Sequence, residues 1–377
     1  MMQYFKNIKN AFKLKHYLNY IVVAAVLVVT FVMYQMDMLK RSDTTLLLQI
    51  GYGIVLAVSL NLVVGFLGEL SLGHAGFMCV GAYIGCYFGI QIMPVINNTL
   101  VVLILSMMVG GLAAAVFGFI IGLPALRLKG DYLAIVTLAF GEIVRTIVKN
   151  IPSFGGAIGM TTTSIKYGRD LFVVAFVVVL FTLFVSQNFV RSKHGRAVTA
   201  IRDNEIAARA MGINVTFYKL FVFVIAAFFA GVAGVLYGVS VSPVAYTAFD
   251  YNYSIEILVM VVLGGMGNIT GSIISAALLT FVNVKLTALG GDLAALKYLI
   301  YALILIFMVM FNNAPAFKQI KDKLTGLLSF SKNKKPADIN DDKASWDKIP
   351  TKIKMDVVLS TDLTPEDNLS SGGHDDE

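Results

Sequence analysis

Long apolar runs, separated by short polar segments, recur along the chain from residue 20 to residue 311. A helix of about 20 apolar residues crosses the hydrocarbon core of a bilayer, and most of these runs approach that length. We therefore predict an all-α polytopic membrane protein with about ten membrane-embedded helical segments; because two runs are short, about eight spans is the alternative. The predicted segments cover residues 20–34, 44–66, 72–93, 99–123, 132–148, 171–189, 217–240, 254–263, 272–289 and 296–311.

The composition agrees with a membrane protein. Of the 377 residues, 57% are hydrophobic and 14% are charged, whereas soluble domains carry about 25% charged residues. The net charge of +7 does not indicate nucleic-acid binding, because the basic residues gather in short loops and in the tails beside the spans. Such loops mark the cytoplasmic side. Arg127, Lys129 and the loop from Arg191 share one side of a ten-segment topology, which predicts that both chain ends are cytoplasmic (N-in/C-in).

The pattern also divides the chain into regions. Residues 1–19 are predicted to be a basic cytoplasmic N-terminus, and the first apolar run a retained span, since no small-residue cleavage site follows it. Residues 20–311 form the transmembrane domain, which includes a long polar cytoplasmic loop at 191–217. Residues 312–377 are predicted to be a largely disordered cytoplasmic tail, because they have few apolar residues and no helical period.

Motifs of enzymes are missing from the sequence. It contains no G-x-x-x-x-G-K-[ST] phosphate-binding loop, no nucleophile elbow and no paired catalytic carboxylates. Cys79 and Cys86 lie seven residues apart in one run, about 10 Å along a helix axis, which is too far for a disulfide. We predict no catalytic residue, no metal site and no cofactor bound by this chain.

The loop at 191–217 contains a short helix signal. Asp203 or Asn204 can cap its start and Gly212 can end it. Arg202, Glu205 and Arg209 are predicted to share one helical face, with Glu205 placed to pair with Arg209. The other side carries Ile206, Ala207, Ala210 and Met211. The helix is interpreted either as a docking element for another protein or as an amphipathic helix that lies on the membrane or caps its own bundle.

Two glycine-rich stretches, 65–77 and 264–272, interrupt the helical pattern at what the topology makes the cytoplasmic ends of hairpins. In transporters, a pair of glycine-interrupted segments indicates the substrate path. The alternative is a pair of tight cytoplasmic turns. The candidate path or hinge residues in these stretches are Gly65, Gly68, Glu69, Ser71, Gly73, His74, Gly264, Gly265, Gly267 and Asn268; a lone histidine such as His74 more often caps neighbouring backbone.

Charged residues inside the apolar runs need a reason, because burying one at mid-membrane costs about 2.5–3.5 kcal/mol on insertion scales. Glu142 and Arg145 lie three positions apart and can pair, while Glu256 and Lys285 lie in later runs. The functional interpretation is a polar path for an amphiphilic solute, with Glu142 and Glu256 as candidates. The structural interpretation is pairing between helices and snorkelling, which we favour for Arg145 and Lys285.

Four blocks in consistent order resemble the permeases of bacterial branched-chain amino acid ABC transporters, LivM branch. They are NLVVGFLGELSLGHAGFMCVGAY (61–83), LRLKGDYLAIVTLAFGEIVR (126–145), HGRAVTAIRDNEIAARAMGINVTFYKL (194–220) and VVLGGMGNITGSIISA (261–276). The likeness runs from about residue 44 to residue 311.

The resemblance implies a multi-pass subunit in the bacterial plasma membrane that translocates branched-chain, hydrophobic amino acids by alternating access. The implied partners are a second, LivH-like permease subunit or a second copy of this chain, two cytoplasmic ABC ATPases that bind ATP and Mg, and an extracytoplasmic substrate-binding protein. The surrounding partner is the lipid bilayer, and no nucleic acid is implied.

The loop then resembles the permease EAA motif, E-A-A-x-x-x-G, whose helix sits in a groove of the ATPase. Ala207, Ala208 and Gly212 keep the spacing, but Ile206 stands at the position of the glutamate and Glu205 lies one residue early. The implied ATPase-coupling residues are Arg202, Asp203, Glu205, Ala207, Ala208, Arg209 and Gly212.

Other functions stay open at this point. A urea or short-amide ABC permease shares the glycine-turn signatures. An ion-coupled secondary transporter, driven through Glu142, Glu256 or His74, would need no ATPase but leaves the basic loop unexplained. A membrane scaffold gives no reason for polar groups inside the spans.

Overall fold

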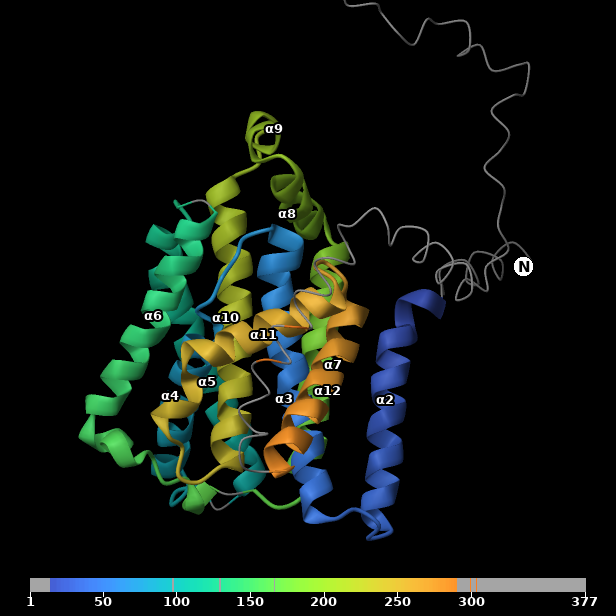
Figure 1. Cartoon of the computed structure of the whole chain (residues 1–377), viewed down its shortest axis with the longest axis vertical. Coiled ribbons are helices and arrows are strands. Elements are labelled where there is room, and N and C mark those ends of the chain that lie inside the picture. Colours follow the sequence, from blue (N-terminus) through green and yellow to red (C-terminus); the bar gives the residue numbers. More distant parts are fainter. Residues whose placement is uncertain are drawn as a thin grey trace, which may run out of the picture. The chain divides into compact units, whose positions relative to one another are not determined.

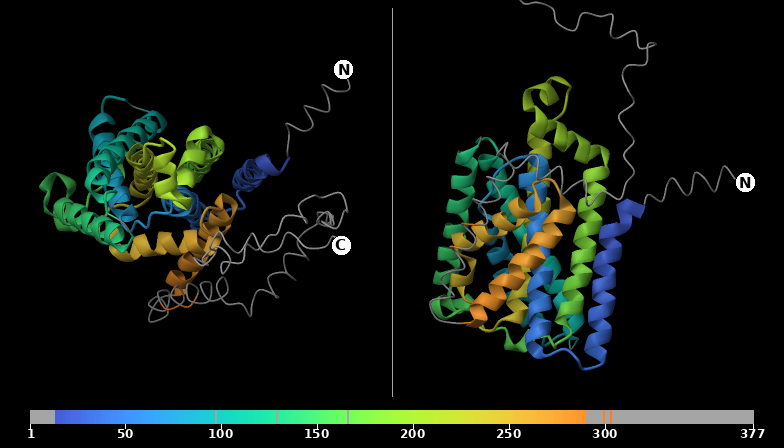
Figure 2. Two further views of the ribbon diagram at one scale, coloured as in Figure 1. Left: turned by 90° about the horizontal axis from the view of Figure 1, so that it is seen from above. Right: turned by 45° about the vertical axis from the view of Figure 1, so that its right-hand side comes forward.

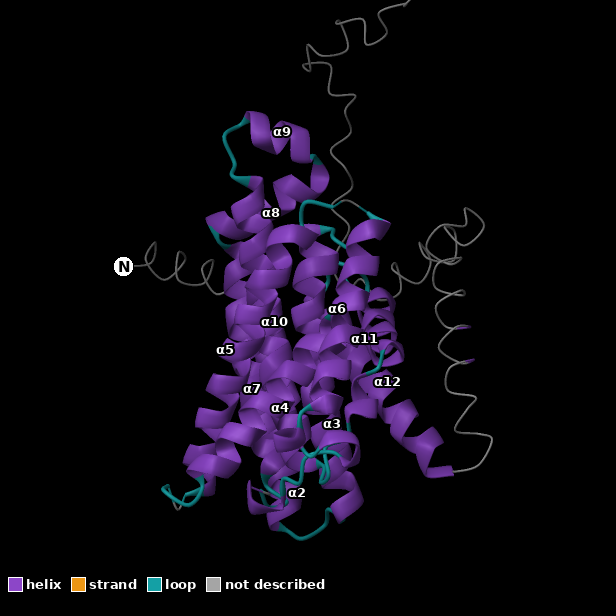
Figure 3. Cartoon of the chain, turned by 90° about the vertical axis from the view of Figure 1, so that its left-hand side faces the viewer, coloured by secondary structure: helices purple, strands orange, loops and turns teal. Residues whose placement is uncertain are grey.

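The computed structural model describes residues 14–96, 98–128, 130–165, 167–289, 299 and 303, all within the unit Met1–Asn312. This part of the chain is helical (Figures 1 and 3), and its only strand-like feature is an isolated antiparallel bridge between Met160 and Val244. Nine of the predicted segments coincide with helices. These are α2 (Leu14–Gln35), α3 (Arg41–Asn61), α4 (His74–Ile92), α5 (Thr99–Ala125), α6 (Asp131–Asn150), α7 (Leu171–Arg191), α10 (Val215–Ser240), α11 (Tyr251–Gly264) and α12 (Ile269–Leu289).

The predicted segment 296–311 and the predicted tail 312–377 lie outside the described residues, apart from Leu299 and Leu303. Six of the described helices are long and apolar enough to span a membrane, and Asn19–Gln35 and Tyr251–Gly264 are shorter apolar helices. The protein is therefore a polytopic membrane protein. Helix α6 carries more charged residues than the six candidate spans and buries only one of its faces. It is therefore not among the six, although its sequence pattern is apolar.

From α2 to α10, successive long helices run in opposite directions, as Figure 1 shows. Helices α3, α5 and α7 finish at the end of the bundle where α8 (Lys193–Asp203) and α9 (Glu205–Ala210) lie, here called the α8–α9 end. Seen from above, α2 and α6 lie at opposite margins (Figure 2). The 3-10 turns η2 (Pro152–Phe154), η3 (Gly156–Ile158), η4 (Thr163–Ile165) and η5 (Tyr246–Phe249) connect helices at the other end.

The core of the bundle is the packing of α4, α5 and α10, which depends on small residues. A Cβ atom added at Gly81 would lie 2.3 Å from the Cα of Gly231, and one at Gly118 would lie 2.6 Å from the Cβ of Ala227. Between helices in lipid the hydrophobic effect does not drive association. Close approach of the backbones, which gives van der Waals contact, stabilises the packing instead. Between these contacts lie fully buried side chains such as Phe77 and Phe223, whose rings pack edge to face with centroids 5.4 Å apart.

Helix α3 does not end in regular geometry. It continues as the π-helix η1 (Leu62–Leu67), which Gly68 terminates with φ +81°. Glu69 N then donates to the carbonyl of Val63, 3.1 Å away. The chain crosses to the start of α4 through residues 68–73. Helix α11 is shorter than its neighbours and crosses the front of the bundle obliquely in Figure 1. Both departures from straight spans occur next to a glycine-rich stretch.

Candidate functional site

The polar loop after α7 contains two helices where the sequence predicts one. Asn204 has extended backbone (φ −157°, ψ 102°), which breaks the chain between α8 and α9. Its side chain accepts from Ala207 N at 3.0 Å and so caps α9, because short polar side chains stabilise a helix start in this way. The prediction of a capped start at Asn204 is confirmed. The prediction that Arg202 shares a face with Glu205 and Arg209 is wrong, because Arg202 belongs to α8.

Helix α9 lies beyond the ends of the neighbouring helices (Figures 1 and 3) and presents an apolar surface. Ile206 is 81% exposed and Met211 82% exposed, while Ala208 is buried against the bundle. Ala207 and Ala210 are exposed between them, and Gly212 ends the turn with φ +81°. Helix α9 and its end therefore carry two large apolar side chains on their outer side.

The inner side of α9 is fixed by a charge network. Glu205 accepts from Arg209 Nη2 at 2.9 Å, as predicted, and also from Lys219 Nζ at 3.2 Å. Lys219, in the second turn of α10, also donates to Glu69 in the loop after η1. The Lys219 side chain is 5% exposed and that of Glu69 14% exposed. Helix α9, helix α10 and the first glycine stretch are therefore joined by one buried ammonium group.

Arg202 makes the second connection to the first glycine stretch. Its Nη1 donates to the carbonyl of Gly65 at 3.0 Å, and its guanidinium also pairs with Asp203 at 3.0 Å. A Cβ atom at Gly68 would lie 2.7 Å from the Cγ of Arg202, so the stem of the arginine packs against that turn. The basic loop is thus in direct contact with the irregular end of α3.

The two glycine stretches, which begin 199 positions apart at Gly65 and Gly264, meet each other. Asn61 at the end of α3 accepts from Gly267 N and donates to Ser272 Oγ, both at 2.9 Å. A Cβ atom at Gly65 would lie 2.2 Å from Gly267 N, so no larger residue fits between the turns. Candidate path residues from both stretches therefore form one junction, which we call the glycine junction: Gly65, Gly68, Glu69, Gly264, Gly265, Gly267 and Asn268.

Within the second stretch, glycines set the helix crossing. Gly265 and Gly267 have φ +88° and +79°, and Asn268 caps α12 by accepting from Gly271 N at 3.2 Å. A Cβ atom at Gly264 would lie 2.4 Å from the carbonyl carbon of Gly271, so α11 and α12 touch through their backbones.

The start of α4 is buried and held by other helices. Leu72 N donates to Thr137 Oγ1 of α6 at 3.0 Å, and Ala75 N donates to Ser254 Oγ of α11 at 3.1 Å. His74 Nε2 lies 2.8 Å from Ser59 Oγ. The prediction that His74 caps neighbouring backbone is therefore wrong, since its partner is a side chain of α3.

Two further candidates sit in the same region. A Cβ atom at Gly73 would lie 2.6 Å from the carbonyl oxygen of Thr137, so this glycine is required by close packing. Ser71 is buried, and its hydroxyl has no hydrogen-bond partner among the described residues. The loop between η1 and α4 is thus tightly packed and tied to α6 and α11.

The remaining intramembrane charges separate into two groups. Glu142 and Arg145 pair at 3.1 Å on α6, as predicted, and Arg145 also lies over the ring of Tyr246. They are apart from the glycine junction. Lys285 is exposed, with its ammonium 5.6 Å from the ring centre of Phe281, which agrees with the structural interpretation.

Glu256 lines a half-open cavity of about 470 Å³. The carboxylate accepts from Asn283 Nδ2 of α12, and the residue is 6% exposed. Tyr52 of α3 and Tyr237 of α10 also line the cavity, with ring centroids 5.9 Å apart. The cavity therefore combines one buried acid with aromatic surface.

Comparison with known families decides what kind of site this is. The model of the "Branched-chain amino acid transport system / permease component" family matches residues 44–309, about 70% of the chain. The chain belongs to this family of permeases.

The permease is 36% identical over 262 residues to the "High-affinity branched-chain amino acid transport system permease protein LivM" of Salmonella typhimurium, a match covering 60% of this chain and 59% of the relative. It therefore spans about three fifths of that relative's length. It is 30% identical over 278 residues to the "Probable branched-chain amino acid transport permease protein LivM" of Methanocaldococcus jannaschii, covering 64% and 79%. It is 26% identical over 284 residues to the "Ribose import permease protein RbsC" of Escherichia coli, covering 71% and 84%. No solved structure is significantly similar.

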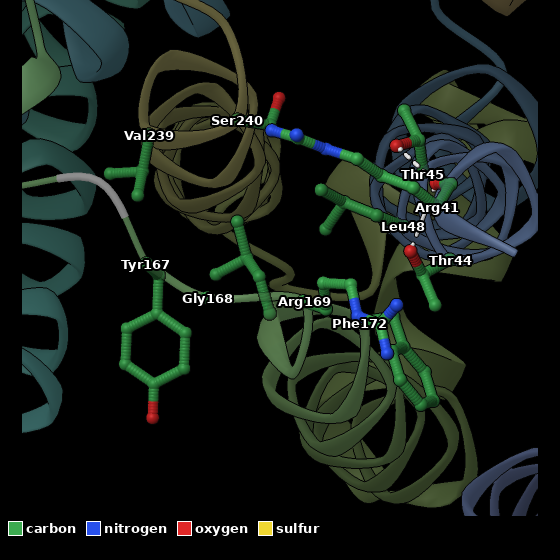
Figure 4. A pocket seen from close by; sticks show the side chains of 11 residues that line it. Arg41, Thr44, Thr45, Leu48, Tyr167, Gly168, Arg169, Phe172, Val239 and Ser240 are labelled. Atoms are coloured by element: carbon green, nitrogen blue, oxygen red, sulfur yellow. Dashed lines mark hydrogen bonds between the residues drawn. The ribbon is translucent and has the colours of Figure 1, made fainter. Parts of the chain in front are cut away.

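A second cavity, of about 210 Å³, is lined by residues at the end of the permease opposite α9. Figure 4 shows its lining side chains. Arg41 at the start of α3 and Arg169 before α7 both line it. Arg169 pairs with the exposed Asp37 at 3.1 Å and lies over the ring of Tyr34. Arg169 therefore has both an acidic and an aromatic partner at this end of the bundle.

Sequence reasoning missed the residues that join the candidates. Lys219, Asn61, Ser254 and Thr137 each connect two distant segments of the permease. The sequence does contain a signal for Lys219, because a lysine inside an apolar run needs a buried partner. The other three are ordinary polar residues within spans, and only contacts in space distinguish them.

Proposed function

We propose that this permease is the membrane-spanning subunit of an ATP-driven ABC importer for branched-chain amino acids in the bacterial plasma membrane. The two relatives named for branched-chain amino acid transport match at 36% and 30% identity, and the ribose permease matches at 26%. That difference favours hydrophobic amino acids over sugars as the transported class, and urea or a short amide is the alternative substrate. The subunit performs transport and no covalent chemistry.

The proposed topology has ten membrane-embedded segments with both ends cytoplasmic. The α8–α9 end carries Arg127, Lys193, Arg196, Arg202 and Arg209. An excess of arginine and lysine in short loops favours the cytoplasmic side. Helix α9 then faces the compartment that contains ATP.

Helix α9 is the proposed docking element for an ABC ATPase, and the observation that carries this proposal is its exposed apolar surface. Ile206 and Met211 are more than four-fifths exposed although they belong to a short, well-capped helix and its end. Because α9 packs on the bundle through Ala208, these two outer side chains are left for a partner surface. ATP and Mg bind to the partner ATPases; the permease needs neither.

Two polar contacts are proposed to transmit the movement of the docked helix to the membrane spans. Lys219 connects Glu205 of α9 to Glu69, and Arg202 connects α8 to Gly65. Both contacts end at the glycine junction, where α3 passes into η1. Closure of the ATPases would move α8 and α9 together, shift the junction and switch the bundle between outward and inward openings. A second permease subunit and a substrate-binding protein complete the proposed complex.

The test is co-purification of the tagged chain from its native membrane in mild detergent. Ile206→Glu is expected to abolish recovery of a P-loop ATPase, because a carboxylate replaces an apolar side chain at the docking surface. Val95→Glu is the matched control: Val95 is also 81% exposed but lies at the opposite end. Equal ATPase recovery in both variants would contradict the docking proposal. Uptake of leucine without any ATPase would favour the ion-coupled alternative.

A further inference from the structure

Helix α6 is covered by the rest of the bundle on one face only. That face packs on α4, where a Cβ atom at Gly76 would lie 2.7 Å from the Cα of Gly141. Seen from above, α6 lies at a margin of the bundle (Figure 2). Within the described part of the chain its other face is exposed, and we call the following residues the open face of α6: Tyr132, Ile135, Ala139, Ile143, Thr146 and Ile147.

A charged pair borders the open face close to the middle of the helix. Glu142 and Arg145 pair at 3.1 Å, and their side chains are 34% and 27% exposed. The 20 residues of α6 extend over about 30 Å, the thickness of the hydrocarbon core, so the pair lies deep in the membrane. Charged groups at that depth almost always face protein or a water-filled cavity, because contact with lipid is costly. Lipid is therefore an unfavourable neighbour for this side of α6.

Helix α5, which precedes α6 in the chain, provides the contrast. Its exposed residues are apolar, and Met108, Leu112 and Val116 on that side are about half exposed. The helix contains no charged residue. Lipid can cover α5 without desolvating a charge, whereas the open face of α6 calls for protein.

The residues of the open face suit contact with another membrane helix. Ala139 and Thr146 lie two turns apart near its centre, and such small residues let a second backbone approach closely. The Thr146 hydroxyl is satisfied within α6, because it donates to the carbonyl of Glu142 at 2.8 Å. Ile135 and Ile143 supply larger apolar surface beside them. The open face thus combines a close-packing stripe with one acid at its edge.

A second copy of this chain would not give that acid a partner. Two copies with one orientation in a membrane are related by a two-fold axis along the membrane normal, so their α6 helices would pack in parallel. A residue on one side of the contact then meets residues from the other side of the facing helix. At 3.6 residues per turn, Glu142 lies on one side of Ala139, and Ile143 and Ile147 lie on the other. Isoleucine offers no hydrogen-bond donor to a carboxylate.

We propose that the open face of α6 is the surface on which the second permease subunit packs, and that this subunit is a different chain with a hydrogen-bond donor at the depth of Glu142. The proposal rests on the proposed function, which requires two permease subunits. The Glu142 carboxylate accepts from Nη1 of Arg145. A carboxylate has about four acceptor sites, so it can accept from the partner as well.

The first test places a photoreactive residue on the open face. Ile143→p-benzoylphenylalanine and the control Leu112→p-benzoylphenylalanine, on α5, are made in the tagged chain expressed with its partner subunits. Both native side chains are more than half exposed. Illumination of the native membrane is expected to join position 143 to a second permease chain of the same family, identified by mass spectrometry. Position 112, which faces lipid, is expected to give no protein product.

Co-purification in mild detergent gives the second test. Ala139→Phe places a ring at the centre of the open face and should prevent recovery of the second permease, whereas Leu112→Phe should not. The double variant Glu142→Leu, Arg145→Leu leaves no charge unpaired. It is expected to lower recovery of the second permease about threefold, as for the loss of one hydrogen bond between membrane helices. The ATPase should remain bound to all three variants, because α9 is unchanged, and its recovery shows that the chain is folded.

Several results would overturn the proposal. A photoproduct that joins position 143 only to lipid, to another segment of the same chain or to a second copy of it would do so. Equal recovery of the second permease with Ala139→Phe and with Leu112→Phe would do so as well. Failure of the proposed function would look different, because the unaltered chain would then recover no ATPase, whatever residues occupy positions 139 and 142.

Discussion

Arg202 donates a hydrogen bond to the main-chain oxygen of Gly65, although 137 positions of sequence separate them. One residue lies in the helix that precedes α9, and the other lies in the π-helical end of a membrane span. Gly65 lies in the last turn of η1, where carbonyl groups have no partner further along the helix and can accept from other donors. The polar loop outside the spans is therefore hydrogen-bonded directly to the irregular end of a membrane span.

Replacing Arg202 by Gln should weaken transport without releasing the ATPase. The shorter side chain cannot keep both the Gly65 contact and the Asp203 pair, which would cost about 1–2 kcal/mol for a partly exposed charged group. We expect leucine uptake to fall several-fold while the ATPase still co-purifies. Lys193→Gln, on an exposed position of the same helix, is the control. Loss of the ATPase from Arg202→Gln would instead place Arg202 in the docking surface.

Replacing Lys219 by Met should destabilise the α8–α9 end. The substitution leaves Glu69 and Glu205 facing each other without the buried ammonium group, and breaking a buried pair in this way costs about 3–5 kcal/mol. We expect a lower midpoint of heat-induced aggregation in detergent, measured by size-exclusion chromatography. The double variant Lys219→Met, Glu69→Gln should recover part of the loss, because the more buried of the two acids is then neutral. A double variant no more stable than Lys219→Met would contradict the network.

Replacing Gly65 by Ala should separate the two glycine stretches. The added Cβ would lie 1.9 Å from Asn61 Oδ1 and 2.2 Å from Gly267 N, so the turns must move apart. Overpacking of this kind costs about 1–3 kcal/mol, and we expect uptake to be lost at normal protein level. Gly168→Ala, where nothing lies within 4 Å, should leave uptake unchanged. Normal uptake by Gly65→Ala would show that the junction is not part of the switching mechanism.

Replacing Gly81 by Ala tests the core of the bundle. The new Cβ would lie 2.3 Å from both the Cα and the carbonyl oxygen of Gly231, backbone atoms that cannot move aside. We expect poor yield and a lower thermal midpoint. Gly141→Ala is the matched control on α6, since its Cβ meets Gly76 at an ordinary 3.8 Å. Similar stability of both variants would contradict the close backbone packing of α4 against α10.

The number, order and approximate bounds of the described apolar helices, α2 to α7 and α10 to α12, could be predicted from the sequence alone. In a bilayer every backbone polar group must be satisfied within the segment, so an apolar run has one available structure and the pattern identifies it. The cap at Asn204 and the pair of Glu205 with Arg209 were also predictable, because both depend on neighbours within four positions. The same local reasoning failed at Arg202. The helical period placed Arg202 on one face with Glu205 and Arg209, but the cap residue Asn204 separates Arg202 in α8 from the other two in α9.

The arrangement that gives these elements a function came only from the tertiary structure. The two glycine stretches form one junction, because Asn61 accepts a hydrogen bond from Gly267 across a sequence separation of 206 residues. Lys219 joins three elements, and Glu256 faces a cavity built from five helices. The sequence determines which polar residues must be buried inside the protein, since each polar side chain in a membrane span is costly when it faces lipid. Which buried residues become partners depends on how the helices cross. Those crossings are set by close contacts such as Gly81 with Gly231, which the residues near either glycine in the sequence do not reveal.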